Sequence, residues 1–306
     1  AGTFQALIGM AEARNTEEFI WSLQLFDNPH QNVVFADTAG SWGYWMAGRV
    51  PIRASGASAQ LPVPGWTGEH DWVEWVPFEE KPHVLAPERG YIVTANNAQV
   101  TDQTKLMAIG SNWFPPYRAQ RITELIEATE VHDAGSLLAI QMHAGSAFTT
   151  RYKGHAVEAF RAEGLEELAG RLEAWDGVMA LESTEATLFH TWWRELRQRF
   201  MQEYYGGESG YFPGAVLERA LDGEGEIHLP TGFAEEAARS ASEYADLPWG
   251  EAHRLSLPHP MADVPVLGSL LRFGRSGIPR VGGPNSVNVA PFGGTRPPFT
   301  SAYGPS

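Results

Sequence analysis

The sequence has no cysteine among its 306 residues, which excludes disulfides, thiolate metal ligands and cysteine nucleophiles. It also has no run that approaches the roughly 18 consecutive apolar residues typical of a membrane-spanning helix, so no membrane span is expected. Basic residues are scarce: 22 Lys and Arg stand against 37 Asp and Glu, and the formal net charge is −15. Because nucleic acid binding needs a basic face, nucleic acid is not an expected partner.

The residues that are abundant indicate a large folded domain. Hydrophobic residues make up 43% of the chain, and its 11 tryptophans suggest large packed aromatic surfaces. No internal repeat or clean linker divides the sequence, so we predict a single partial domain over residues 1–306. Within it, residues 1–122 carry helices and strands, 123–250 form a mainly helical excursion, and 251–306 return to the sheet and are truncated.

The N-terminal region alternates between helical and strand patterns. Helical spacing predicts a helix over residues 4–13, and Asn15 with Glu18 three positions on is a variant of the capping box that begins a second helix. The buried face of that second helix is predicted to consist of Phe19, Ile20, Leu23 and Phe26. Residues 32–37 and 42–47 are predicted to pair as a hairpin.

Further elements follow from the same patterns. Strands are predicted over residues 71–78, 90–96 and, near the C-terminus, 285–291. Helices are predicted over residues 117–128, 134–148, 156–175, 184–204 and 233–247, with Asp133 and Ser183 as N-caps and Gly164 as a weak point.

Motifs for several chemistries are absent or weak. The sequence has no glycine-rich nucleotide-binding motif, no GxSxG and no HExxH. His253 and His259 are separated by a spacing that fits neither a helix face nor a strand face, so a zinc site is not expected. Glu173 and Asp176 form a carboxylate pair of the kind that glycosidases use, but a helix end followed by an Asp-Gly turn explains them better.

Residues 91–97, YIVTANN, combine an apolar strand-like run with two amide side chains. Asn is depleted in strands because its side chain competes for backbone hydrogen bonds. Two interpretations follow from this local pattern. The pair either ends the strand in a turn, or one of the two amides is a hydrogen-bond donor aimed at a reacting atom.

Seven stretches of the sequence together resemble the β-subunit of the penicillin acylase family of N-terminal nucleophile hydrolases. These stretches are residues 31–53, 61–65, 71–97, 112–122, 172–193, 247–261 and 282–292, in the family's order. A single piece such as LPVPG is weak, but the combination is specific and covers most of the chain.

The resemblance implies an α+β fold, the αββα sandwich in which two antiparallel sheets lie between helix layers. It also implies an amidohydrolase made as one self-cleaving precursor, whose new N-terminal Ser attacks N-acyl amides such as penicillins and acyl-homoserine lactones. The α-amino group of that Ser serves as its base, so no histidine and no catalytic cofactor are needed. The expected partners are the α-subunit, the missing parts of the β-subunit and an N-acyl substrate, in the periplasm or outside the cell.

The N-terminus departs from the family pattern. Ala1 has no nucleophile, Thr3 is not terminal, and the matching region begins inside the β-subunit. We therefore expect the nucleophile upstream of this chain and expect the chain to be inactive alone. The alternative is a non-catalytic protein that keeps the fold and binds a small molecule or glycan.

The resemblance assigns roles to four polar residues. Asn96 matches the family Asn that donates its side-chain amide to the oxyanion, and Asn97 would orient it. Arg121 matches an Arg in the active-site network, where it would hold polar partners or a substrate carboxylate; a structural ion pair is the alternative. Arg118, three residues earlier, would share its helix face.

The resemblance also suggests structural calcium, held by carboxylates and backbone carbonyls. A carbonyl near Ala59 and the side chain of Asn112 are the candidate ligands, although the family pattern has Asp where this chain has Asn112. Asp37 and Asp102 are interpreted as turn residues instead.

Four tryptophans lie on the predicted strands: Trp42, Trp45, Trp72 and Trp75. The default expectation is that they pack in the core between the sheets. A role for some of them in lining an acyl pocket is the alternative.

Overall fold

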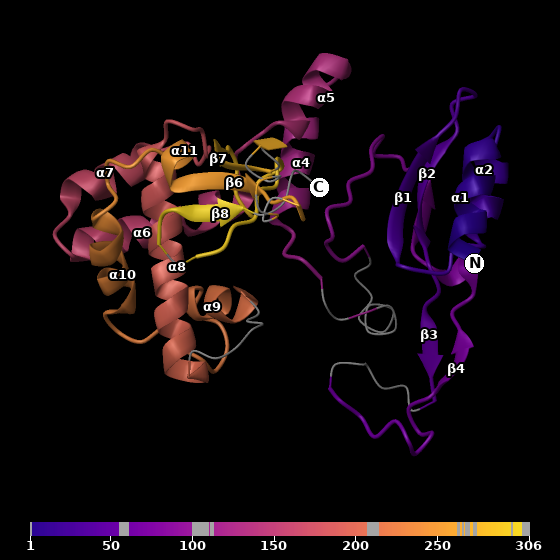
Figure 1. Ribbon diagram of the computed structural model, residues 1–306, viewed down its shortest axis with the longest axis horizontal. Coiled ribbons are helices and arrows are strands. Elements are labelled where there is room, and N and C mark those ends of the chain that lie inside the picture. Colours follow the sequence, from indigo (N-terminus) through magenta and orange to yellow (C-terminus); the bar gives the residue numbers. More distant parts are fainter. Residues whose placement is uncertain are drawn as a thin grey trace. The chain divides into compact units, whose positions relative to one another are not determined.

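The computed structural model describes residues 2–54, 61–99, 110, 113–206, 214–261, 264, 266, 270–271, 274–294 and 296–301. It divides into two compact units, Ala1–Pro116 and Tyr117–Ser306, which are described separately below (Figure 1). The predicted single domain with three regions stays a prediction.

The first unit consists of two helices and a small set of antiparallel strands. Its elements are α1 (Gly2–Glu12), α2 (Thr16–Leu23), β1 (Gln31–Ala36), β2 (Trp42–Ala47), β3 (Pro51–Arg53), β4 (Trp72–Trp75), the 3-10 helix η1 (Phe78–Glu80) and β5 (His83–Leu85). The strands form a sheet of order β1-β2-β5 and a separate β3-β4 pair. The helices α1 and α2 cover one face of β1 and β2 (Figure 1), where Ala6, Leu23 and Trp45 share a buried cluster.

The predicted start of α2 and the predicted hairpin are both confirmed. The Asn15 side chain accepts a hydrogen bond from the Glu18 backbone N–H at 2.9 Å, while the Glu18 carboxylate accepts one from the N–H of Arg14. In the turn between β1 and β2, the Asp37 carboxylate accepts hydrogen bonds from the backbone of Thr16, Ala39 and Ser41. The Ser41 contact is the main cause that holds the pKa of Asp37 below its ordinary value. Asp37 is therefore a turn residue, as expected.

The second unit is mainly helical. Its elements are α4 (Tyr117–Glu127), α5 (Ala134–Gln141), α6 (Ala147–Ala162), α7 (Glu166–Ala174), α8 (Thr184–Tyr205), α9 (Gly214–Leu221), α10 (Phe233–Ser242), α11 (Trp249–Ala252), β6 (His253–Leu257), β7 (Arg275–Pro279) and β8 (Phe299–Ser301). The long helix α8 lies at the centre, beside α6, α7, α10 and α11 (Figure 1). The strand β6 pairs antiparallel with β7 and parallel with β8.

The core of the second unit surrounds α8. Its largest fully buried side chains include Trp192, Phe189 and Phe200 of α8, together with Trp249 and Phe299 from the C-terminal elements. Fully burying side chains of this size contributes roughly 1.5–3 kcal/mol each. This core includes side chains of the helices and of the β7-β6-β8 sheet. The helical pattern of the sequence alone does not predict that the sheet packs on these helices.

Two predicted helices are divided in the structure. The predicted helix over 134–148 ends at Gln141, and α6 begins again after the N-cap Ser146. The predicted helix over 156–175 is interrupted at Gly164, whose φ of 75° is left-handed and suits a residue without a side chain. The Asp176 carboxylate accepts from the N–H of Val178, which is the turn expected there.

Removing the N-cap of α8 should destabilise the second unit. The Ser183 side chain accepts a hydrogen bond from the Ala186 N–H at 3.1 Å, and Ser183→Ala should cost about 1 kcal/mol of unfolding free energy. Urea unfolding measures this loss. Ser183→Asn keeps a capping oxygen and serves as the control. An alanine variant as stable as the wild type would show that the cap contributes nothing.

The expectation of a tryptophan core holds for Trp45 and fails for two others. Trp45 is buried and stacks on Phe78, but Trp72 is 62% exposed and Trp75 is 41% exposed. Both lie on the β3-β4 pair, in which Trp72 and Trp75 pack edge to face on one another. Within the described residues no hydrophobic cluster covers this pair, which is why these side chains remain exposed.

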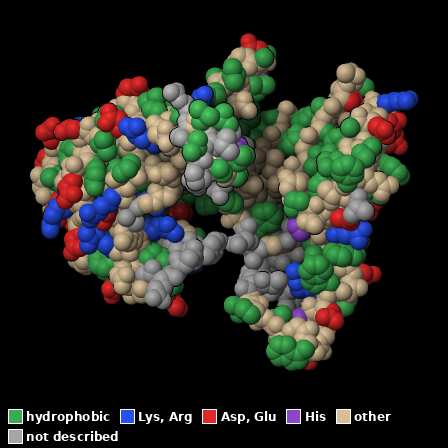
Figure 2. Space-filling view, in the orientation of Figure 1, with side chains coloured by type: hydrophobic (Ala, Val, Ile, Leu, Met, Phe, Trp, Pro, Cys, Tyr) green, Lys and Arg blue, Asp and Glu red, His purple; other side chains and the backbone are tan. Residues whose placement is uncertain are grey.

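Large hydrophobic side chains are also exposed elsewhere in both units, as the green surfaces of Figure 2 illustrate. They include Phe4, Leu7, Ile8 and Trp21 on α1 and α2, and Leu137 and Leu138 on α5. Among the helices that the structure describes, none combines the length and the apolar character needed to cross a membrane.

Candidate functional site

Asn96 lies in a loop of residues 91–99, here called the amide loop. Its φ of 61° is in the left-handed region, which Asn tolerates better than most residues with a side chain. The Asn96 carbonyl accepts a hydrogen bond from the Phe114 N–H at 3.0 Å, and its side chain is exposed. The backbone conformation is thus one reason for an Asn at this position, independent of any chemistry.

The second amide of the pair holds the loop together. The Asn97 side-chain oxygen accepts from the Ala95 N–H at 3.1 Å, and its nitrogen donates to the Ala98 carbonyl at 3.0 Å. The predicted strand over 90–96 is therefore wrong: the Asn97 side chain takes a backbone N–H that a neighbouring strand would otherwise bind. Asn97 shapes the backbone on which Asn96 is presented.

Two consecutive hydrogen bonds among three side chains, here called the Tyr44–Asn32–Thr94 relay, connect the amide loop to the sheet of the first unit. The Tyr44 hydroxyl on β2 donates to the Asn32 oxygen at 2.7 Å, and the Asn32 nitrogen on β1 donates to the Thr94 hydroxyl at 2.7 Å. Burial raises the pKa of Tyr44, so its hydroxyl stays protonated and remains a donor. The sequence analysis missed these residues, because only the fold brings Asn32 and Thr94 together.

Arg121 lies on α4 in the second unit and has two partners. Its Nη1 donates to Glu124 Oε2 at 2.8 Å, and its Nη2 lies 3.3 Å from Nε2 of His143. Arg118 precedes it by three residues on the same helix and is half-buried, and this burial lowers the pKa of its guanidinium. Asn96 and Arg121 belong to different units, and each site is described by itself.

His143 is a residue of this site that the sequence analysis missed. Its backbone carbonyl accepts from the Asn288 N–H at 3.0 Å, and its Nδ1 lies 3.0 Å from the Gly145 N–H. Burial is the main cause that lowers the pKa of His143, and the charge of Arg121 lowers it further. His143 is therefore neutral at pH 7.

A cavity of about 500 Å³ lies in the second unit, and its lining includes Met142, the residue before His143, and Asn288, whose N–H binds the His143 carbonyl. It is lined by Gln141, Met142, Leu181, Leu255, Pro279, Arg280, Val281, Val287, Asn288 and Val289. The lining is mostly apolar, and its few polar groups come from Gln141, Arg280 and Asn288. The predicted strand over 285–291 is wrong, because the Ser286 hydroxyl bonds Gly283 and Asn288 and folds this segment into a turn beside the cavity.

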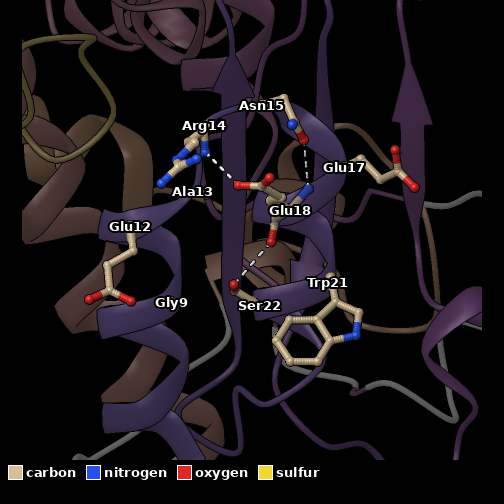
Figure 3. Close-up of a pocket in the computed structure, with 9 residues that line it drawn as sticks. All are labelled: Gly9, Glu12, Ala13, Arg14, Asn15, Glu17, Glu18, Trp21 and Ser22. Atoms are coloured by element: carbon tan, nitrogen blue, oxygen red, sulfur yellow. Dashed lines mark hydrogen bonds between the residues drawn. The ribbon is translucent and has the colours of Figure 1, made fainter.

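A second groove, of about 890 Å³, is lined by residues of α1, of α2 and of the connection between them. Figure 3 draws these lining residues. Three of its polar side chains serve the local helix structure: Asn15 caps α2, Glu18 accepts from the Arg14 N–H, and the Ser22 hydroxyl donates to the Glu18 carbonyl (Figure 3). None of the predicted site residues lines it. The groove is therefore not the candidate site.

The candidate calcium ligands Ala59 and Asn112 lie outside the described residues, as does Asp102. Within the described part of the chain, no group of three or more His, Asp or Glu side chains is placed to hold a metal ion. Calcium binding thus stays a prediction from the resemblance.

Comparison with known proteins relates the chain to one family by sequence and to a solved structure by fold. The family model described as penicillin amidase matches residues 1–306. The chain is 32% identical over 264 residues to penicillin acylase 2 proenzyme from Pseudomonas sp. strain SE83, which is 78% of this chain and 34% of that protein. It is 30% identical over 223 residues to the acyl-homoserine lactone acylase QuiP of Pseudomonas fluorescens, 68% of this chain and 27% of that protein.

A solved structure matches the fold. The thermostable penicillin G acylase from Alcaligenes faecalis superposes with a TM-score of 0.63 at 19% sequence identity, over 79% of this chain and 51% of that one. The mixed α+β architecture is thereby confirmed. The chain spans about a third of the length of the curated relatives it matches.

Proposed function

Because this chain belongs to the penicillin amidase family, we propose that it is part of an amidohydrolase that cleaves N-acyl amide bonds. The observation that carries the proposal is the family match over residues 1–306, together with an amide loop that presents Asn96 on a backbone fixed by Asn97 and Thr94. The complete protein would have the αββα sandwich, to which this chain contributes part of the β-subunit.

The proposed reaction uses a nucleophile from outside these residues. The chain covers 34% of a relative that is named a proenzyme, which supports a longer precursor that yields an N-terminal Ser by self-cleavage. The Ser Oγ attacks the substrate carbonyl, its proton passes to the α-amino group and then to the leaving amine, and water hydrolyses the acyl-enzyme. This chain alone is then inactive.

Asn96 stabilises the charge that develops on the carbonyl oxygen. A fixed neutral donor binds an oxyanion without altering the protonation of the nucleophile's base. Asn96 is an exposed residue of the amide loop. Asn97 fixes the loop backbone, while Arg121, with Arg118 on the same helix, provides a cationic surface for polar groups of the active-site network.

The relatives guide the proposal for the substrate. Two of them are named for penicillin and for acyl-homoserine lactones, so we infer a small N-acyl substrate of this class. The α-subunit of the same precursor and the remaining part of β are the proposed partners. Family likeness also supports periplasmic or secreted localisation and a structural calcium ion in the complete protein.

Expression of the complete reading frame that contains this chain tests the proposal. Mass spectrometry should detect self-cleavage into two chains, and a panel of penicillin G and N-acyl-homoserine lactones of several chain lengths should release free acid from at least one member. A folded, soluble product that neither cleaves itself nor releases acid would instead favour a binding protein that has kept the fold.

A further inference from the structure

We propose that Glu218 is a positioning residue that sets the place of Arg121 by holding the start of helix α4 through Tyr117, a role that rests on the proposed function of Arg121. The Tyr117 hydroxyl donates to Glu218 Oε2 at 2.6 Å, and 101 residues separate the two in the sequence. Tyr117 is the first residue of α4, and Arg121 follows about one helical turn later. A contact that fixes the first turn of α4 therefore also fixes where the Arg121 side chain begins.

Tyr117 anchors α4 in the second unit. Every residue of α4 is described by the structure, and Tyr117 is the one among them that is buried. Its ring packs edge to face on Phe148 at 5.3 Å and on Tyr152 at 6.4 Å, both of them on α6. Burial of the ring is a non-directional force, whereas the hydrogen bond at its end requires one distance and one direction. The Glu218 contact therefore decides how α4 is set.

Glu218 suits this role because its carboxylate needs a donor. It lies on α9 and is partly buried. Burial is the main cause that raises the pKa of Glu218, and the hydrogen bond from Tyr117 opposes this rise. A carboxylate that has lost water without gaining a donor is costly, and a hydrogen bond to a charged acceptor is stronger than one to a neutral acceptor. The pair thus stabilises itself as it joins α9 to α4.

A second group of contacts holds the end of α9 against α6. The Arg151 guanidinium donates to Asp222 Oδ2 at 2.8 Å. The Tyr152 hydroxyl lies 3.3 Å from the same oxygen and 3.3 Å from the Tyr117 hydroxyl. Asp222 follows the last residue of α9, and its N–H donates to the Glu218 carbonyl at 2.9 Å. Glu218 is therefore carried on a helix end that is itself fixed, as a residue that positions another must be.

The ion pair of Arg121 does not replace this restraint. Its partner Glu124 lies on α4 as well, so the pair moves with the helix and does not fix Arg121 against the rest of the second unit. His143 lies outside α4, with Nε2 at 3.3 Å from Arg121 Nη2. After burial, the Arg121 charge is the next cause that lowers the pKa of His143. The pKa of His143 therefore reports whether Arg121 is in place.

This pKa provides a test that does not depend on catalysis. In the complete protein with 15N-labelled histidine, an NMR titration should show the pKa of His143 rising toward its ordinary value in Tyr117→Phe, because Arg121 moves away. Glu218→Leu removes the acceptor together with its charge and should give the same rise in a folded protein. Glu218→Gln keeps a side-chain oxygen for the hydroxyl and should keep the wild-type pKa. Arg121→Ala gives the reference size of the rise.

Activity provides the second test. Tyr117→Phe and Glu218→Leu should each lower kcat roughly 10- to 100-fold, because a displacement of about 1 Å in an active-site network can cost as much as 100-fold. Glu218→Gln should keep most of the activity. Tyr204→Phe is the matched control, since it removes the hydroxyl of an exposed tyrosine on α8 that donates to the His228 carbonyl. It should change neither kcat nor the pKa of His143.

The outcomes separate this inference from the function on which it rests. A His143 pKa that stays at the wild-type value in both Tyr117→Phe and Glu218→Leu would overturn the positioning role, whatever the activity of these variants. A raised pKa with full activity in both would overturn it too, because the place of Arg121 would then not matter for catalysis. Full activity in Arg121→Ala would overturn the role of Arg121 and the catalytic role of Glu218 with it, whereas the amidohydrolase function itself is judged by self-cleavage and acid release.

Discussion

Replacing Asn96 with glycine in the complete enzyme should lower kcat about 100- to 1,000-fold, a loss of about 2.7–4 kcal/mol of transition-state stabilisation. The reason is that the side-chain amide is a donor to the oxyanion, and water cannot replace a fixed donor without reorganisation. Substrate binding in the ground state should change little, so KM should stay close to the wild-type value.

Glycine isolates the loss of the side-chain amide better than alanine does, because Asn96 has a φ of 61°. Alanine at a left-handed position adds roughly 1–2 kcal/mol of backbone strain, which would mix a folding effect with the catalytic one. Glycine removes the amide and keeps the backbone conformation. Thermal unfolding of the variant, measured beside its steady-state kinetics, separates any effect on folding from the catalytic loss. If the glycine variant turns over at the wild-type rate, Asn96 serves only the left-handed turn.

Acidification should destabilise the second unit by several kcal/mol through two buried histidines. His190 on α8 and His253 on β6 lie against Trp249, with ring centroids 5.0 and 4.9 Å away. Burial lowers the pKa of His190 to about 3 and that of His253 to about 4. In the unfolded chain both titrate near pH 6.5.

The direction in which the free energy of unfolding changes with pH follows from proton binding. Below about pH 6.5 these histidines bind protons in the unfolded chain but stay neutral in the folded chain. The free energy of unfolding therefore falls as the pH falls. Each histidine should contribute up to about 1.4 kcal/mol per pH unit until the pH reaches its folded pKa. The stabilisation is fully present above the unfolded pKa.

Urea unfolding between pH 4.5 and 7.5, followed by tryptophan fluorescence, measures this slope. His190→Gln should reduce the slope, whatever it does to stability at neutral pH, because one of the two buried titrating groups is gone. His228→Gln alters an exposed histidine and should keep the wild-type slope. If the unfolding free energy of all three proteins fell with pH at the same slope, the buried histidines would not be the cause of the loss of stability in acid.

Elements whose signals are local were predictable from the sequence. The helix α8 follows from the Ser183 cap and a long helical pattern, and the β1–β2 hairpin follows from two strand patterns and the polar turn at Asp37. In both cases the hydrogen bonds that define the element come from neighbouring residues. Local chemistry and the final structure therefore agree.

Elements that depend on distant partners were not predictable in the same way. The apolar run in the amide loop predicts a strand. In the structure, the Asn97 side chain binds the Ala95 N–H and the Thr94 hydroxyl accepts from Asn32, so the loop does not pair as a strand. The strand β8 exists because it pairs parallel with β6, more than forty residues earlier by the positions of Arg254 and Thr300.

The residues of the candidate site show the same difference between local and distant signals. Asn96 and Arg121 were found because their type and position match a family pattern. His143 has no such signal, since only the fold brings it beside Arg121 from 22 residues away. Tyr44 likewise has no signal beyond its place in a predicted strand, and its contact with Asn32 depends on the pairing of β1 with β2.

The Tyr44–Asn32–Thr94 relay implies an order of events in folding. The β1–β2 hairpin is a local structure, and such hairpins form in about 1–10 μs, whereas the contact of Asn32 with Thr94 closes a loop of 62 residues. Thr94 has no place to dock until Tyr44 has oriented the Asn32 amide. We therefore expect the amide loop to be ordered late, so that in pulsed hydrogen exchange the strand amides become protected before the amide of Ala95.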